Sequence, residues 1–224
     1  MVSQVLSWLA YSLDAAEGNL GFMVWNTFLA VIPFVLSLWV FRGRGSQARK
    51  LSWWIGSAMC LAFLPNAPYV LTDIIHLIHD IRQGHSVWTI TLILVPQYIL
   101  FMAIGMEAYV GTLLNFGHYL KKAGRPNWIL PSELIIHSLT ALGIYLGRFL
   151  RFNSWDLVTR PGTVGLSIIN QLTDKQPLLV MVITFVVIAV LYWLLKQVTL
   201  ALVVYWRLRK QLPGLLLTYH DSNP

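Results

Sequence analysis

The chain has 224 residues, of which 57% are hydrophobic and only 11% are charged. Soluble domains carry about 25% charged residues, so this composition excludes a mainly soluble protein and indicates lipid as the chief solvent. The net charge of +7 does not indicate nucleic acid, because the basic residues fall mainly between apolar runs. Membrane lipids are therefore the expected partners. The single cysteine, Cys60, excludes an intrachain disulfide and a multi-cysteine metal site.

The apolar pattern predicts an all-α polytopic transmembrane bundle. The first segment, Met1–Leu13, is too short to span and is predicted to be an interfacial helix, with a sixth span as the alternative. Five later stretches are long enough to cross about 30 Å of hydrocarbon. They cover residues 20–41, 51–72, 87–116, 131–150 and 177–206. No linker or repeat divides the chain, so residues 1–224 are predicted to form one membrane-embedded domain.

The basic residues of the loops predict an orientation. Three sets fall on one side of a bundle with five spans: Arg42, Arg44, Arg49 and Lys50; Lys121, Lys122 and Arg125; Arg207, Arg209 and Lys210. By the positive-inside rule this side faces the cytoplasm, so the N-terminus is predicted outside and the C-terminus inside. The expected location is the cell (plasma or inner) membrane.

The second span carries an unusual polar string. Pro65 and Pro68 are expected to break it, and Asn66 is expected to cap the helix that resumes at about Ala67. On that helix Asp73 and His76, together with Asp80, share one face. Asp73 and His76 are therefore candidate catalytic residues for proton transfer. A divalent metal is an alternative, held with Asp80 or Asp156, although the spacing matches no known metal motif.

The fourth span ends in a second polar string, near the same predicted outer surface. Arg148 and Arg151 lie three residues apart, and guanidinium groups match the oxygens of a phosphate. The candidate substrate-binding residues are Asn66, Arg148, Arg151, Asn153 and Asp156. The alternative is that these side chains only form a network that fastens spans two and four together, or that the arginines extend to lipid headgroups.

Both strings resemble the signature of a known family. They read FLPNAPYVLTDIIHL over Phe63–Leu77 and YLGRFLRFNSWD over Tyr145–Asp156. They are similar to a bacterial integral membrane protein family of unknown function, domain-of-unknown-function family 1361. The resemblance covers most of the chain from span two onward. It implies a multi-span membrane protein and supplies no activity and no catalytic residues.

An inner polar cluster is predicted nearer the cytoplasmic side. Glu107 is the only acidic residue within span three, and Glu133 and His137 lie four apart on span four. We expect Glu107 and His137 to meet at similar depth, as a proton relay or a cation site. The alternatives are that Glu133 complements the helix dipole and that His137 makes one interhelical hydrogen bond. Lys196 of span five is expected to extend toward the nearer interface.

Three functions are compatible with these patterns. The first is an outward-facing polar pocket that binds or acts on a phosphate-bearing lipid or lipid-linked substrate. The second is a transporter or channel component, since transporters use broken spans and in-span carboxylates. The third is a non-catalytic scaffold of a membrane complex, in which Gly143 and Gly147 allow close helix packing. Whether the protein is an enzyme stays open at this stage.

Overall fold

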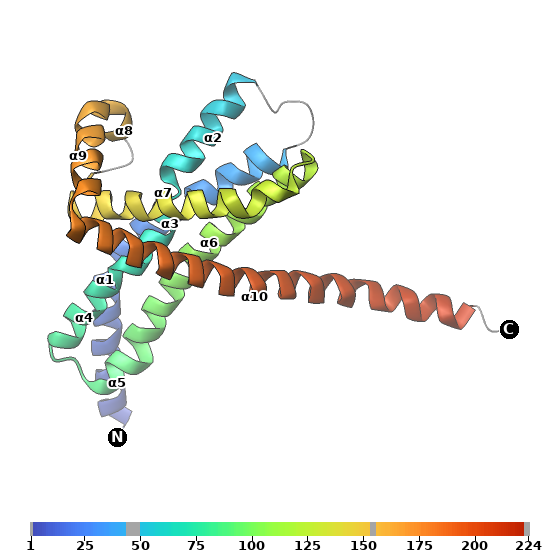
Figure 1. Cartoon of the computed structure of the whole chain (residues 1–224). Coiled ribbons are helices and arrows are strands. Elements are labelled where there is room, and N and C mark those ends of the chain that lie inside the picture. The colour runs from blue at the N-terminus through green and yellow to red at the C-terminus, as the bar shows by residue number, and fades with distance from the viewer. Residues whose placement is uncertain (1, 44–49, 153–155, 222–224) are drawn as a thin grey trace.

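The computed structural model of the chain describes residues 2–43, 50–152 and 156–221, and over these ranges it contains helices and no strands (Figure 1). Five helical segments of this part are long and apolar enough to cross a membrane. They are Val2–Arg42, Leu51–Arg82, Val87–Lys122, Pro126–Arg148 and Lys175–Lys210. The predicted all-α multi-pass bundle is confirmed. The orientation of the termini stays a prediction.

Helix α1 (Val2–Arg42) corrects the prediction for the first segment. It is one helix of 41 residues, so the described part of the predicted segment, Val2–Leu13, forms neither a separate interfacial helix nor a sixth span. The only proline within α1 is Pro33, so no helix-breaking residue separates this segment from span one. Ser12 Oγ lies 2.8 Å from Thr89 Oγ1, which ties the N-terminal part of α1 to the start of span three.

The second span is a chain of short helices. It comprises α2 (Leu51–Phe63), α3 (Asn66–Tyr69), the 3₁₀ helix η1 (Val70–Asp73) and α4 (Ile74–Arg82). The expected capping role of Asn66 is wrong, because α3 begins at Asn66 and Pro65 before it already has helical angles (φ −59°, ψ −25°). The Asn66 amide instead donates to the Phe63 carbonyl (3.0 Å), which the break between α2 and α3 leaves without its usual helical donor.

The third span packs along both preceding ones. It comprises α5 (Val87–Thr89), the π-helical turn η2 (Ile90–Leu94) and α6 (Val95–Lys122), and it lies along α1. A π-helical turn precedes Pro96, which cannot donate a backbone hydrogen bond. Gly105 allows α3 to approach α6 closely, because a Cβ there would lie 2.6 Å from the Ala67 carbonyl oxygen.

The last two spans form the other side of the bundle. They comprise η3 (Pro126–Trp128) with α7 (Ile129–Phe149), and α10 (Lys175–Asp221), joined by α8 (Asp156–Thr159) and α9 (Pro161–Thr173). Helix α7 packs against α10 and touches the break in span two, where a Cβ on Gly143 would lie 2.6 Å from Pro65 Cγ. Figure 1 shows α10 running past the other helices toward the C-terminus.

Candidate functional site

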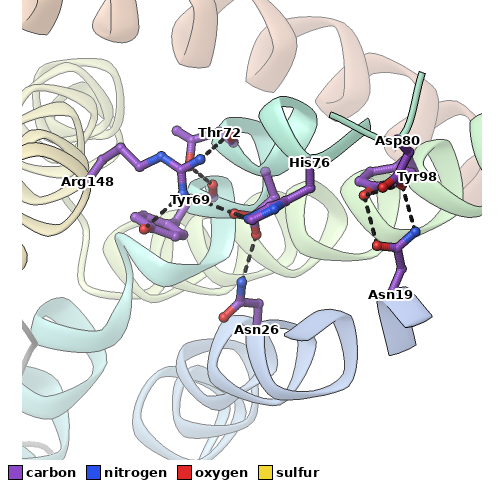
Figure 2. A network of polar contacts seen from close by, with 9 residues as sticks. Asn19, Asn26, Tyr69, Thr72, His76, Asp80, Tyr98 and Arg148 are labelled. Atoms are coloured by element: carbon purple, nitrogen blue, oxygen red, sulfur yellow. Dashed lines mark hydrogen bonds and ion pairs between the residues drawn. The ribbon is translucent and has the colours of Figure 1, made fainter. Parts of the chain in front are cut away.

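A buried carboxylate, Asp73, lies where spans one, two and four meet (Figure 2). Its side chain is only 2% exposed. Asn26 of α1 donates from Nδ2 to Asp73 Oδ2 (2.7 Å), and Arg148 of α7 donates to Oδ1 (3.3 Å). The guanidinium balances the carboxylate charge, so the pair can remain away from water. The Asp73 network is our name for Asn26, Asp73 and Arg148 together with Tyr69 and Thr72, which Arg148 also contacts.

Arg148 is held by further acceptors on span two. It donates to the Thr72 carbonyl oxygen (3.0 Å) and to the Tyr69 hydroxyl (3.5 Å), and its guanidinium lies 5.8 Å from the centre of the Tyr69 ring. The 3₁₀ turn of η1 and the break before α3 help to present these groups on one side of span two. The structure therefore brings together the predicted residues Asp73 and Arg148, and Arg148 contacts three groups of span two.

A second buried pair repeats the first along the same two helices. Asn19 donates to Asp80 Oδ2 (2.8 Å), and the Tyr98 hydroxyl donates to Asp80 Oδ2 (3.2 Å) and Asn19 Oδ1 (3.3 Å) (Figure 2). Asn19 and Asn26 are seven residues apart on α1, as Asp80 and Asp73 are on span two. A spacing of seven returns to the same side of a helix, so two amide–carboxylate pairs fix the antiparallel register of spans one and two.

The other residues predicted for the Asp73 face are more exposed or belong to another pair. His76 lies at the edge of the Asp73 network, with Nε2 3.9 Å from Asp73 Oδ1, but its side chain is 46% exposed and its ring lies 4.6 Å from the Phe22 ring, tilted by 34°. Asp80 belongs to the second pair. In the described part of the chain no three His, Cys, Asp or Glu side chains are grouped so as to hold a metal ion. The metal alternative for these residues therefore has no support in the geometry.

A cavity of about 300 Å³ lies beside the Asp73 network, between α1, the break in span two and the end of α7. Its polar lining consists of Asn26, Asn66, Tyr69 and Arg151. Its apolar lining includes the aromatic residues Trp25, Phe63 and Phe152. We call this the Arg151 cavity, because Arg151 is the charged residue among its described lining.

Arg151 differs from Arg148 in its surroundings. It is exposed, has a left-handed backbone (φ 58°), and makes no hydrogen bond or ion pair with the described residues. The Phe152 amide donates to the Leu146 carbonyl (3.1 Å) across this turn, which ends α7. Of the other predicted binding residues, Asn153 lies outside the described residues, and Asp156 is half-buried at the start of α8, apart from the described cavity lining.

A second network joins spans four and five. Glu133 Oε1 accepts from the Lys196 ammonium (2.6 Å) and from the Tyr192 hydroxyl (2.6 Å), and the Glu133 side chain is 9% exposed. Lys196 is therefore an ion-pair partner rather than a side chain that extends to the interface. We call these three residues the Glu133 network. They line a cavity of about 480 Å³, together with His137.

The expected meeting of Glu107 and His137 does not occur. His137 Nδ1 lies 2.7 Å from the Tyr109 hydroxyl, whereas Glu107 accepts from Thr199 Oγ1 (3.0 and 3.3 Å) on α10. Helix α10 supplies the partners of both Glu107 and Glu133, so it separates the predicted inner cluster into two sites. The reason is geometric, because α10 packs against both α6 and α7.

A family model described as protein of unknown function (DUF1361) matches residues 25–190. The chain belongs to the DUF1361 family. No curated protein and no solved structure matches it. The matched region contains the Asp73 network and the Arg151 cavity, but Asn19 and Lys196 lie outside it. The family and the five apolar spans together establish a multi-pass membrane protein and assign no activity.

Sequence reasoning missed the neutral partners of the buried carboxylates. Asn19, Asn26, Tyr98 and Tyr192 are uncharged, so their residue types alone do not mark them as partners of a carboxylate. A signal was present in the spacing. The amides of span one and the carboxylates of span two both recur after seven residues, which predicts two facing pairs on antiparallel helices.

Proposed function

We propose that the Arg151 cavity binds the phosphate-bearing headgroup of a lipid or lipid-linked substrate. The observation that carries this proposal is the guanidinium of Arg151, which has no partner among the described residues, at a cavity whose other described polar lining is neutral. Guanidinium groups form strong, geometrically matched hydrogen bonds with phosphate oxygens. The Asn26, Asn66 and Tyr69 side chains supply neutral hydrogen-bonding groups for the rest of the headgroup.

The apolar wall favours an amphiphile over a soluble anion. Trp25 is 57% exposed, so it faces the surroundings of the bundle and also lines the cavity. Leu29 and Ala62 extend the same wall between α1 and α2. A headgroup at Arg151 would therefore leave its chains against an apolar surface. The positive-inside rule assigns this end of the bundle to the outer leaflet.

The Asp73 network has a positioning role in this proposal. Asp73 is buried and belongs to none of the described cavity lining, but it holds Asn26, which does line the cavity. Arg148 in turn contacts the Tyr69 hydroxyl, which also lines the cavity. The proposed function is therefore binding, with Asp73 and Arg148 as supports and Arg151 as the contact to the phosphate.

Binding to the purified protein tests the proposal. Native mass spectrometry would compare phosphatidic acid with diacylglycerol of the same chains, which differs only in lacking the phosphate. We expect the wild type to prefer phosphatidic acid and Arg151→Gln to bind it about 10-fold more weakly or worse, the loss of a charge-assisted hydrogen bond. Arg82→Gln is the matched control, because Arg82 is exposed at the end of α4 and lies outside the cavity lining.

Two results would reject the proposal. One is equal binding of diacylglycerol and phosphatidic acid by the wild type. The other is an equal loss of binding in the Arg151 and Arg82 variants, which would indicate attraction by net charge alone. A reconstituted protein that moves ions or solutes with Arg151→Gln unaffected would instead favour a transporter.

A further inference from the structure

A second cavity, of about 370 Å³, lies between α6 and the C-terminal part of α10. Glu107 and Thr199 line one end of it, and Arg207 and Lys210 line the other. We call it the Arg207 cavity. Its described lining contains no residue of the Asp73 network or of the Glu133 network.

Two cations of the Arg207 cavity have no partner within the described chain. Arg207 and Lys210 are three residues apart, so they share one face of α10. Both are exposed and make no hydrogen bond or ion pair with the described residues. Arg209 lies between them in sequence and is not part of the described lining; its guanidinium lies 5.5 Å from the centre of the Trp206 ring.

The carboxylate of Glu107 limits where an anion can sit. It accepts from Thr199 Oγ1, which is eight residues before Arg207. Eight residues of helix correspond to about 12 Å, so like-charge repulsion excludes an anion from the Glu107 end and leaves it at the mouth. The cavity thus has a carboxylate at one end and two cations at the other, and the end with the cations lies at the predicted cytoplasmic surface.

The walls between these ends are apolar and uncovered. Leu202 and Val203 line the cavity while remaining 53% and 42% exposed, and Trp206 is 54% exposed. The apolar run that ends at Trp206 is about 45 Å long as a helix, whereas the hydrocarbon core is about 30 Å thick. Lipid chains are the chemically matched cover for such a surface, and tryptophan is typical of the headgroup level.

We propose that the Arg207 cavity is a binding site for an anionic phospholipid of the cytoplasmic leaflet. Arg207 and Lys210 contact the phosphate and its anionic headgroup at the mouth, and the chains lie against Leu202 and Val203. Basic pockets between helices on this side of a membrane recognise such headgroups. The site is independent of the Arg151 cavity, with which it shares no lining residue among those described.

The test measures lipid binding in the Arg151→Gln background, so that the outer cavity does not contribute. Native mass spectrometry would compare phosphatidylglycerol with phosphatidylcholine of the same chains. Each basic side chain near an anionic headgroup contributes a factor of about five, so Arg207→Gln with Lys210→Gln should weaken phosphatidylglycerol binding about 30-fold. Lys121→Gln with Lys122→Gln is the control, because it removes the same charge at exposed positions outside the cavity lining.

The Glu107→Gln variant tests whether the Arg207 cavity binds an anion or a cation, since the sequence suggested a cation site at Glu107. Loss of the carboxylate should leave phosphatidylglycerol binding unchanged or tighter, and a weaker affinity would overturn the proposal. Equal losses in the two double variants, or equal affinity for the two lipids, would also overturn it. Competition by glycerol 3-phosphate at the lipid's own concentration would replace the lipid by a soluble phosphate and reject the membrane source. None of these outcomes depends on whether Arg151 binds a ligand.

Discussion

The Asp73 and Glu133 networks each bury a carboxylate against a cation from another span, but they do so differently. Both oxygens of Asp73 are engaged, by an amide at 2.7 Å and a guanidinium at 3.3 Å. Glu133 receives its ammonium and its hydroxyl on one oxygen, both at 2.6 Å. The Asp73 network joins three spans, whereas the Glu133 network joins two.

This difference shows why a buried charge in a span is not by itself a functional site. Ionisable groups in membrane spans are functional candidates by default. Each oxygen of Asp73, however, accepts a hydrogen bond within the protein, and Asp73 is not part of the described lining of the Arg151 cavity. Arg151, which lines a cavity and has no partner among residues 2–43, 50–152 and 156–221, lies just beyond the end of α7. Buried pairs in this protein therefore stabilise helix packing, and the cations beside cavities that have no partner among the described residues are those for which we propose ligands.

The largest effect is expected from breaking the Asp73 network. Asp73→Ala leaves the Arg148 guanidinium, whose side chain is 23% exposed, without its counter-charge. Removing one partner of a buried pair costs about 3–5 kcal/mol. Unfolding in mixed micelles should therefore show a large loss of stability. His79→Ala is the control and should change stability by less than about 0.5 kcal/mol, since His79 is exposed on α4 and lies outside the Asp73 network.

A double variant sharpens the same test. Asp73→Leu combined with Arg148→Met removes both charges and should recover much of the lost stability. If the double variant were as unstable as the sum of the single ones, the two residues would not act as a pair. Lipid binding should still be weakened in the double variant, because Asn26 and Tyr69 lose the contacts that position them.

A smaller effect is expected in the Glu133 network. Lys196→Met leaves a nearly buried carboxylate with the Tyr192 hydroxyl as its remaining described donor, and should cost about 2 kcal/mol. The cost is lower than for Asp73 because Glu133 is 9% exposed against 2% for Asp73, and because Glu133 itself lines a cavity that can admit water. Glu133→Gln in the Lys196→Met background should restore stability, and no recovery would show that the two residues are not coupled.

The spans could be predicted from composition because lipid demands about 20 apolar residues for each crossing. The break in span two followed from Pro65 and Pro68, whose backbone nitrogens cannot donate. The continuity of α1 could not be predicted in this way. The segment before Leu13 is short as an apolar run. Tyr11 contacts His85 and Ser12 contacts Thr89, and such tertiary contacts cannot be predicted from the average hydropathy of a segment.

The sequence predicted which charged residues belong to the sites, but it did not predict how all of them pair. Facing strings in spans two and four brought Asp73 and Arg148 into one hypothesis, because both charges are costly alone in lipid. The separation of Glu107 from His137 could not be foreseen, since it depends on how α10 packs against α6 and α7. The different surroundings of Arg148 and Arg151 likewise depend on the left-handed turn that ends α7. The residue types in this segment do not predict that turn.

Close packing of α3 on α6 offers a third test of what supports the Asp73 network. Gly105→Ala places a Cβ 2.6 Å from the Ala67 carbonyl oxygen and 2.5 Å from Val70 Cγ2, so the backbone must shift. Such overpacking costs about 1–3 kcal/mol and should also weaken lipid binding at the Arg151 cavity. Gly21→Ala is the control, since nothing lies within 4 Å of the added Cβ. It should be neutral or stabilise α1 by about 0.5–1 kcal/mol.

The smallest effect separates stability from binding at Arg151 itself. Its backbone has φ 58°, a conformation that costs a residue with a Cβ about 1–2 kcal/mol and costs glycine almost nothing. Arg151→Gly should therefore be about 1 kcal/mol more stable than Arg151→Gln, although both variants lose the guanidinium and bind phosphatidic acid equally weakly. Stability measured in the same micelles as binding checks both statements. If Arg151→Gly were both more stable and still bound phosphatidic acid as the wild type does, the guanidinium would have no role in binding, and the strained turn would have to be explained by packing alone.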